Sequence, residues 1–342
     1  MLGVNDIGVD LGTATVLIYM KNKGILLREP AMVAIDKNTR NPLAWGEKAY
    51  MMLGRTPANI AVIRPLADGS IVDYDTAERM LRYFLRRVLG KRMVFRPRVV
   101  ASLPAAVTEV EKSSMVDAIL SVGARKAQLI DESVAAAIGA GLDVQKAYGS
   151  MVVNIGGGIT GLAVLAMGRC VVSDATTKAT GDRMSEAIIR YLRRKHNLMI
   201  GERSAEMLKI NIGAAQPRKD VLYMEVTGRN LLTGLPKTIA VSSTEMADAM
   251  DETIQTLVES MQAMLERTPP ELVTDIFDRG IVLTGGGSQL FGLDKLLSDQ
   301  LRVDCRVADD PVASVVLGIG MILEEIETHG KLLLEGGART GR

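Results

Sequence analysis

The chain has 342 residues, a length that predicts two domains or one large α/β unit. Its 41 lysine and arginine residues balance 40 aspartate and glutamate residues, so we expect no strongly basic surface for nucleic-acid binding. Hydrophobic residues make up 47% of the chain and charged residues 24%, which excludes disorder as its main state. With two cysteines and two histidines, neither a disulfide framework nor a dense metal cluster is expected.

The sequence contains no segment typical of secretion or of membrane spanning. Residues 1–6 carry no basic stretch followed by an apolar one, so we expect no signal peptide. The most apolar segment, 312–323, is 12 residues long and contains two glycines, whereas a transmembrane helix needs about 20 residues. We therefore expect a cytosolic protein that is attached at most to a membrane surface.

The first half of the chain is predicted to begin with strands and to continue with alternating strands and helices. Short β-rich runs lie on both sides of the turn Gly12-Thr13-Ala14. Thr108 and Glu111, three residues apart, form a capping box that opens a helix. An alanine-rich helix is expected to begin at Ser133. The expected strands are 7–11, 15–20, 25–28, 99–103 and 127–130, and the expected helices are 108–123 and 133–139.

The second half is predicted to restart with a buried strand at 151–155, a glycine turn and another strand. Apolar residues at three- and four-residue spacing predict the helices that follow, and Pro269-Pro270 ends the longest one. Pro311 is a good first-turn residue and is expected to begin the last core helix. The other expected strands are 160–167, 221–227, 238–242 and 281–283, and the expected helices are 181–196, 202–212, 244–267, 293–301 and 311–327.

The two halves open in the same way. The segments 7–12 and 152–156 both consist of a β-run, an acidic or amide residue and the start of a glycine turn. Their spacing of about 145 residues is much longer than the period of a solenoid repeat. Two related halves that face each other would form a cleft with one glycine turn on each wall.

Three glycine-containing turns each follow a buried β-run: Gly12-Thr13-Ala14, Gly156-Gly157-Gly158 and Gly285-Gly286-Gly287. Such turns expose consecutive backbone N–H groups that hold phosphate oxygens, because no Cβ blocks the approach. One such triplet alone also fits an ordinary hairpin turn, but three in these contexts favour phosphate binding. The chain has neither the P-loop pattern nor the dinucleotide pattern Gly-x-Gly-x-x-Gly after its first strand, which disfavours both of those folds.

Four segments resemble the nucleotide-binding motifs of the actin-like ATPase superfamily. The run Ile7-Gly8-Val9-Asp10-Leu11-Gly12-Thr13-Ala14 resembles its first phosphate loop, and 154–160 resembles its second. The segment 131–139 resembles the connecting segment of that superfamily, and 283–288 resembles its adenosine loop.

Within this superfamily, the chain resembles the bacterial actins of the MreB family, over residues 6–327. The segments that carry this resemblance are 201–209 (GERSAEMLK), 231–238 (LLTGLPKT), 267–272 (RTPPEL) and 308–311 (ADDP).

The resemblance implies an actin-like ATPase fold, an α/β architecture of two duplicated RNase H-like domains around a nucleotide cleft. The first domain would comprise residues 1–145 and 311–342, with a small subdomain at about 33–64. The second domain would comprise residues 146–310, with a small subdomain at about 181–242.

The resemblance also implies ATP or ADP with Mg²⁺ as cofactors. The two glycine turns would hold the phosphates from both sides, and a pair of residues one helical turn apart would reach the ribose and base. The adenosine loop would pack on the nucleoside. The residues implied as cofactor-binding are Gly12, Thr13, Ala14, Thr15, Asn154, Gly156, Gly157, Gly158, Glu206, Lys209, Gly285, Gly286, Gly287 and Ser288.

Two carboxylates complete the implied site. Asp10 would bind the waters around Mg²⁺, which prefers oxygen ligands and keeps much of its hydration shell. Glu132 matches the family position that orients the attacking water and is the implied catalytic residue. Without the resemblance, Glu132 can also be explained as an acidic residue in the first turn of a helix, where the helix dipole favours a negative charge.

The second phosphate loop departs from the family pattern near the γ-phosphate and the metal. The family usually has Asp at Asn154, Thr at Ile159 and an acid at Gly161, and the first loop differs mildly at Thr15 and Val16. Phosphoryl transfer depends on positioning and electrostatics, so these changes predict slow or absent hydrolysis with ATP binding retained. The alternative is that Glu132 and Asp10 suffice for ordinary activity.

The resemblance implies a filament-forming protein. MreB-like chains stack head to tail into protofilaments, and such a contact, which does not close, gives an open polymer. Its implied partners are other copies of the chain, the anionic membrane surface, and cell-wall synthesis and morphogenesis proteins, with a role in cell shape. The alternative is a small-molecule kinase or another non-polymerising member of the superfamily, although no convincing substrate carboxylate is evident in the first half.

A membrane-binding loop is the last feature that the resemblance implies. Val94 and Phe95 form an apolar tip with basic residues on both sides. Apolar groups can enter the headgroup region while basic neighbours meet anionic lipids. The alternative is that Phe95 is buried beside Pro97. The first interpretation predicts a cytoplasmic protein peripheral to the inner face of the cell membrane.

Overall fold

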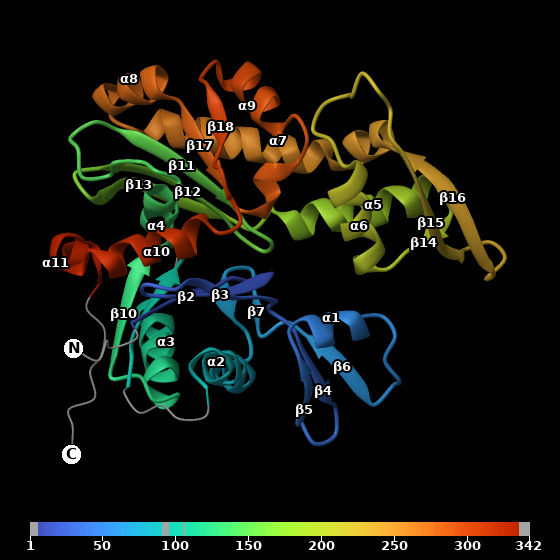
Figure 1. Cartoon of the computed structure of the whole chain (residues 1–342). Coiled ribbons are helices and arrows are strands. Elements are labelled where there is room, and N and C mark those ends of the chain that lie inside the picture. The colour runs from blue at the N-terminus through green and yellow to red at the C-terminus, as the bar shows by residue number, and fades with distance from the viewer. Residues whose placement is uncertain (1–5, 91–95, 105–106, 335–342) are drawn as a thin grey trace.

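Two five-stranded sheets form the centre of the protein (Figure 1). The computed structural model describes residues 6–90, 96–104 and 107–334. The first sheet contains β1 (Ile7–Leu11), β2 (Thr15–Met20), β3 (Gly24–Pro30), β9 (Arg98–Leu103) and β10 (Lys126–Asp131). The second contains β11 (Ser150–Ile155), β12 (Thr160–Ala166), β13 (Arg169–Thr176), β17 (Ile281–Thr284) and β18 (Cys305–Val307).

The two sheets have the same topology, and the predicted duplication is confirmed. β1 pairs antiparallel with β2 and parallel with β9. β11 pairs in the same way, antiparallel with β12 and parallel with β17. The strand orders β10-β9-β1-β2-β3 and β18-β17-β11-β12-β13 therefore correspond strand for strand. Each central strand leads directly into a predicted glycine turn.

Helices cover the outer faces of both sheets, and most begin where the sequence predicts. The capping box of Thr108 and Glu111 is present, and Ser242 with Glu245 forms another at the start of the longest helix. No helix within the described ranges is long and apolar enough to cross a bilayer. The helices beside the first sheet are α2 (Tyr74–Leu89) and α3 (Glu109–Ser121), and those beside the second are α7 (Ser243–Arg267), α8 (Pro270–Arg279) and α9 (Leu293–Leu301).

The last core helix differs from the expectation. It begins at Ser314, not at Pro311, and it breaks at Glu325 into α10 (Ser314–Glu324) and α11 (Ile326–His329), which the short 3₁₀ turn η2 (Gly330–Leu332) follows. The carbonyl of Pro311 accepts a hydrogen bond from the Gly285 N–H at 2.7 Å, so the residues before α10 form a turn that is tied to the predicted adenosine loop. This long-range contact, which no local pattern encodes, takes the place of the first helical turn.

Helices α4 (Glu132–Gly139) and α10 cross between the two sheets at a pair of glycines. A Cβ on Gly139 would lie 1.8 Å from the Ser314 carbonyl oxygen, and a Cβ on Gly318 would lie 1.9 Å from that of Ala135. The backbones can approach this closely only because neither glycine has a side chain. Buried residues of both sheets, among them Val100 and Val152, share one hydrophobic cluster with these helices.

Two smaller sheets extend from the same side of the molecule (Figure 1). The first lies after β3 and is followed by the short hairpin β7 (Leu66–Ala67) and β8 (Ser70–Ile71); the second lies among helices after β13. The predicted limits of the domains and subdomains stay predictions. The first small sheet contains β4 (Val33–Asp36), β5 (Pro42–Trp45) and β6 (Ile60–Ile63) with α1 (Glu47–Met52), and the second contains β14 (Leu198–Met199), β15 (Tyr223–Asn230) and β16 (Pro236–Ser242) with α5 (Gly181–His196) and α6 (Glu202–Ile212).

We predict that Gly318→Ala lowers the free energy of unfolding by roughly 2 kcal/mol or more, because the new methyl group would overlap a backbone atom that no rotamer change can move. The gain in helix propensity, about 1 kcal/mol, is smaller than this cost. Urea denaturation measures the change. Gly330→Ala is the matched control, since its nearest atom would be 3.7 Å away; equal stabilities of the two variants would contradict the tight crossing.

Candidate nucleotide site

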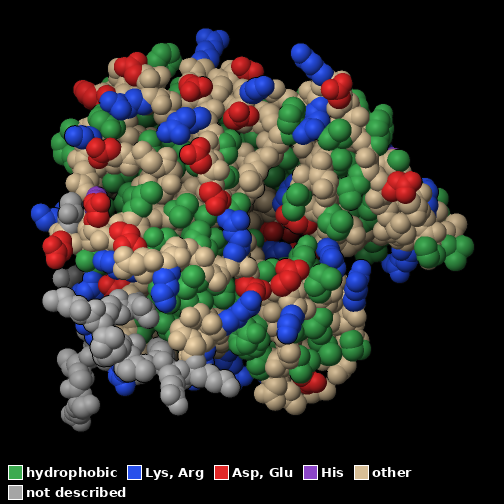
Figure 2. Space-filling view, viewed as in Figure 1, with side chains coloured by type: hydrophobic (Ala, Val, Ile, Leu, Met, Phe, Trp, Pro, Cys, Tyr) green, Lys and Arg blue, Asp and Glu red, His purple; other side chains and the backbone are tan. Residues whose placement is uncertain are grey.

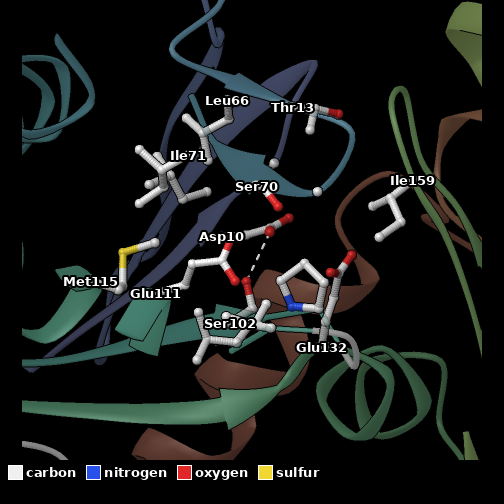
Figure 3. Close-up of a pocket in the computed structure, with 16 residues that line it drawn as sticks. Asp10, Thr13, Leu66, Ser70, Ile71, Ser102, Glu111, Met115, Glu132 and Ile159 are labelled. Atoms are coloured by element: carbon white, nitrogen blue, oxygen red, sulfur yellow. Dashed lines mark hydrogen bonds between the residues drawn. The ribbon is translucent and has the colours of Figure 1, made fainter. Parts of the chain in front are cut away.

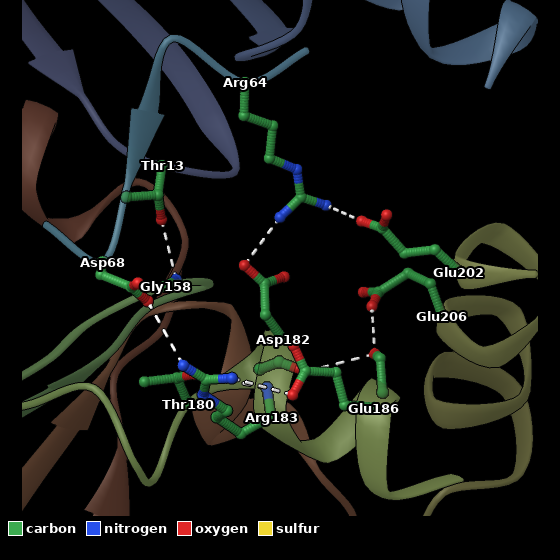
Figure 4. A network of polar contacts seen from close by, with 12 residues as sticks. Thr13, Arg64, Asp68, Gly158, Thr180, Asp182, Arg183, Glu186, Glu202 and Glu206 are labelled. Atoms are coloured by element: carbon green, nitrogen blue, oxygen red, sulfur yellow. Dashed lines mark hydrogen bonds and ion pairs between the residues drawn. The ribbon is translucent and has the colours of Figure 1, made fainter. Parts of the chain in front are cut away.

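The two phosphate-loop turns meet at the bottom of a cleft between the halves. The Gly158 N–H donates a hydrogen bond to Thr13 Oγ1 at 2.8 Å (Figure 4). A Cβ on Gly157 would lie 2.6 Å from the Cβ of Ala14. Figure 2 shows a hollow between the upper and lower halves, with acidic and basic side chains at its rim. The predicted turns thus come together from strands on opposite walls.

The first turn is held by its own strands. The Gly12 N–H donates to the Thr15 carbonyl at 3.1 Å, so Thr15 closes the hairpin and begins β2. The second turn is held in the same way, because the Gly156 N–H donates to the Ile159 carbonyl at 3.0 Å. The hairpin turn that the sequence left open as an alternative is therefore present at both positions, and in both it faces the other wall.

Asp10 and Glu132 face one cavity beside the first turn (Figure 3). Burial raises the pKa of Asp10 to about 6, although Ser102 Oγ donates a hydrogen bond to its carboxylate at 3.0 Å. Burial and the nearby charge of Asp10 raise the pKa of Glu132 to about 8. Two carboxylates that resist ionisation side by side are a suitable environment for a cation, which would relieve both effects.

Asn154 connects Glu132 to the second sheet. Its Nδ2 donates a hydrogen bond to Glu132 Oε1, and its Oδ1 accepts one from Thr284 Oγ1 at 3.2 Å. The amide is therefore fixed on both sides, and it binds the carboxylate as a neutral donor. An aspartate at this position would instead place a third carboxyl group beside Asp10 and Glu132.

Ile159 and Gly161 give this end of the cleft an apolar side. Ile159 lines the same cavity and packs against Gly69 in the β7–β8 hairpin. The contact is close, since a Cβ on Gly69 would lie 2.5 Å from Ile159 Cδ1. Gly161 lies opposite Ser133, whose Oγ would be 3.5 Å from an added Cβ. Neither residue offers a hydroxyl or a carboxylate to the cavity.

Glu206 and Lys209 lie on one face of α6 and form an ion pair of 2.7 Å. Lys209 Nζ also donates to the Gly181 carbonyl at 2.8 Å, and Glu206 accepts from Ser185 Oγ at 2.8 Å. Gly181 in turn donates its N–H to the Gly156 carbonyl at 3.0 Å. The predicted ribose-binding pair is thus connected to the second phosphate loop through Gly181.

The predicted adenosine loop packs against the strand that carries the second phosphate loop. Gly285 has a φ of +79°, which favours glycine, and η1 (Gly286–Gln289) follows it. A Cβ on Gly287 would lie 2.4 Å from Ile155 Cγ2, and Ser288 Oγ donates to the Gly285 carbonyl at 2.7 Å. The structure therefore brings 285–288 to the same side of the cleft as 156–158.

Ion pairs across the mouth of the cleft were not predicted from the sequence. Arg64 follows β6 and pairs with Asp182 at 2.7 Å and with Glu202, which lie at the starts of α5 and α6 (Figure 4). Arg183 approaches Asp68 at 3.8 Å. Arg64 and Asp182 are 118 residues apart in the chain, and no local pattern signals such a contact.

The structure does not test the predicted membrane-binding loop. Val94 and Phe95 lie outside the described residues. Within the described ranges, no group of three or more histidine, cysteine, aspartate or glutamate side chains is arranged to hold a metal ion.

The fold defines a class of protein, the actin-like ATPases. MreB5 of Spiroplasma citri bound to ADP matches this structure with a TM-score of 0.92 at 31% identity, over 96% of this chain and 98% of that chain. The MamK double helical filament shares the fold, with a TM-score of 0.79 at 20% identity, over 94% of this chain and 99% of that chain.

Sequence comparisons identify the family. The MreB/Mbl protein family matches residues 4–331. The cell shape-determining protein Mbl of Bacillus cereus is 45% identical over 96% of this chain and 98% of its own length. The cell shape-determining protein MreB of Escherichia coli strain K12 is 44% identical over 95% of both chains. The chain belongs to the MreB/Mbl family, and the predicted resemblance is confirmed.

We predict that Glu132→Gln stabilises the nucleotide-free, metal-free protein in a pH-dependent way. The pKa of Glu132 is about 8 in the folded chain against a usual 4.5, so between these values the folded state binds more protons than the unfolded state. The free energy of unfolding of the unchanged protein therefore falls as the pH rises from 4.5 to about 8. Glutamine does not ionise, so the variant does not lose stability in this way. The variant should have the higher Tm at pH 8 and a similar Tm near pH 4.5.

Glu111→Gln is the control for this measurement. Glu111 lines the same cavity, but hydrogen bonds from Thr108 lower its pKa, so its replacement should not stabilise the protein at pH 8. A Glu132→Gln variant that melts at or below the temperature of the unchanged protein at pH 8 would contradict the assigned environment.

Proposed function

We propose that this chain binds ATP between its two glycine turns and assembles into membrane-associated filaments that help to determine cell shape. The observation that carries this proposal is the contact of Thr13 with Gly158, because it brings the amide-bearing turns of both halves to one point in the cleft. Family membership supports the same conclusion, since the curated relatives are cell shape-determining proteins. Family membership also favours a cytoskeletal role over the activity of a small-molecule kinase.

The nucleotide would lie along the contacts that connect the two walls. Its β- and γ-phosphates would accept hydrogen bonds from the backbone amides of Thr13, Ala14 and Gly157, because the amides of Gly12, Gly156 and Gly158 already donate within and between the turns. Glu206 and Lys209 would reach the ribose, and 285–288 would lie against the nucleoside. The related MreB5 of Spiroplasma citri has been solved with ADP and with AMPPNP, which supports an adenine nucleotide here.

Mg²⁺ would lie beside Asp10. A divalent cation there would neutralise the phosphate charge and lower the energetic cost of ionising Asp10 and Glu132. With few protein carboxylates in reach, its other ligands would be phosphate oxygens and water.

Hydrolysis would be slow because the γ-phosphate end of the cleft lacks side chains that are free to orient water or to bind the phosphate. Asn154 binds Glu132, which would otherwise be free to orient a water, and Ile159 offers no hydrogen bond to the phosphate. Nucleotide binding uses backbone amides that these two residues leave unchanged. Binding and hydrolysis are therefore separable in this chain.

The filament would form by head-to-tail stacking of copies, with a contact that does not close. MamK, which shares the fold, forms a double helical filament, and this illustrates what the fold permits. The proposed partners beyond other copies are cell-wall synthesis and morphogenesis proteins.

The membrane contact would be made by the loop that carries Val94 and Phe95. This loop follows α2, whose last turn presents the exposed Arg86 and Arg87, and it precedes the exposed Arg96. Arg86 and Arg96 would meet anionic headgroups while the apolar tip enters the bilayer surface, whereas Arg87 forms an ion pair with Glu29. The protein would then lie on the inner face of the cell membrane.

We predict that Asn154→Asp combined with Ile159→Thr increases phosphate release from ATP by roughly tenfold or more, because it restores groups that act on the γ-phosphate and the metal. Affinity for ADP should change little. A coupled assay of phosphate release from the purified chain measures the rate, and Glu132→Gln in the double variant should abolish the gain. Equal rates for the unchanged and double-variant proteins would remove the hypothesis of weakened hydrolysis.

We predict that the chain pellets on centrifugation with ATP and Mg²⁺, and that it floats with anionic liposomes in a density gradient. Val94→Ser with Phe95→Ser should keep the pellet and lose the flotation, because only the membrane contact is removed. A chain that stays in the supernatant with ATP would contradict the filament. Unchanged flotation of the variant would refute the assigned loop.

A further inference from the structure

A pocket lies beside Lys209, and no residue of the first phosphate loop is part of its lining. Its walls are the end of α6 with Ile210 and Gly213, the η1 turn with Leu290, and the side chains of Arg218 and Phe291. Lys209 lines this pocket and also donates to Gly181, which is bonded to the second phosphate loop. A ligand whose phosphates lie between the glycine turns can therefore extend past Lys209 into this space.

The two segments that carry Arg218 and Phe291 are held together by their backbones. Ala214 and Phe291 form an isolated parallel bridge, and the Ala215 N–H donates to the Phe291 carbonyl at 2.8 Å. Gly213 leaves room for the second segment, because a Cβ there would lie 2.9 Å from Leu290 Cδ1. The wall of the pocket is thus built from segments that tertiary contacts fix in place.

Arg218 stacks on Phe291. The Cζ atom of its guanidinium lies 3.7 Å from the ring centroid, which is close contact of a planar cation with an aromatic face. Its Nε is buried and has no hydrogen-bond partner within the part of the chain that the structure describes. The stacked pair therefore forms a flat cation–aromatic surface in the lining of the pocket.

We propose that Arg218, supported by Phe291, stacks against the base of the bound nucleotide and gives this site a preference for purines. This inference rests on the proposed nucleotide function and names the residues that recognise the base. A flat guanidinium on an aromatic ring stacks well on a purine, whose two fused rings overlap it more than a pyrimidine does. Arg218 and Phe291 are outside the residues that the sequence motifs assigned to the site.

Isothermal titration calorimetry with ADP, CDP and inorganic pyrophosphate tests the proposal. The unchanged protein should bind ADP more tightly than CDP. Arg218→Ala should weaken ADP binding roughly tenfold, reduce the preference for ADP over CDP, and leave pyrophosphate binding unchanged. Phe291→Leu should act in the same direction. Retained pyrophosphate binding shows that each variant is folded and that its phosphate site is intact.

Two further variants separate stacking from simple charge. Arg218→Lys keeps the charge but loses the planar face, so it should behave like Arg218→Ala. Lys219→Ala removes an exposed charge next to it in the chain and should bind like the unchanged protein. ADP binding by Arg218→Ala that equals that of Lys219→Ala would overturn this inference alone. Absence of ADP binding by the unchanged protein would overturn the proposed function and this inference together.

Discussion

The crossing of α4 and α10 is the constraint on which the rest of the structure depends. Gly139 and Gly318 let the two helix backbones touch, and the helices lie between the sheets of the two halves. Residues from both sheets bury their side chains in the same cluster around this crossing. Because the duplicated sheets are fixed to one pair of helices, their central strands β1 and β11 end close together. The glycine turns that follow these strands then meet in the cleft.

The duplication supplies two equivalent turns, but the side chains around them have diverged. The first half contributes the oxygen-rich groups Asp10 and Thr13, whereas the second contributes Asn154, Ile159 and bare backbone amides. The result is a site with backbone donors on both walls and one acidic end. Under the proposed function, such a site would bind a polyphosphate with a cation and would activate water poorly. Occupancy of the cleft, more than turnover, would then control assembly.

Ion pairs join the two walls at the mouth of the cleft. Arg64 bridges to the starts of α5 and α6, and α6 also carries Glu206 and Lys209. A nucleotide that fills the cleft therefore contacts elements that these ion pairs already hold. The ion pairs therefore join the first small sheet to the helices beside the second one.

The sequence predicted the strands that flank the glycine turns, the turns themselves and most helices, because hydrophobic periodicity, capping boxes and glycine runs are local signals. It did not predict α2, the outer strands β13 and β18 of the second sheet, or the short strands β5 to β8 and β14. It also predicted the duplication from the matching starts at 7–12 and 152–156. The predicted start of the last core helix at Pro311 was wrong, because Gly285 holds the chain there in a turn. Arg64 and the Arg218–Phe291 stack were missed for the same reason: each depends on a partner that only the folded chain brings near.

The claim that one triphosphate is held from both walls is tested most directly by calorimetry of Mg²⁺-ATP with the unchanged protein and with Gly157→Ala. The added methyl group would lie 2.6 Å from Ala14 Cβ and would block the junction of the turns. We expect one nucleotide per chain and an affinity that falls by roughly tenfold or more in the variant, which should still fold. No heat with the unchanged protein, or the same affinity in both, would contradict the account.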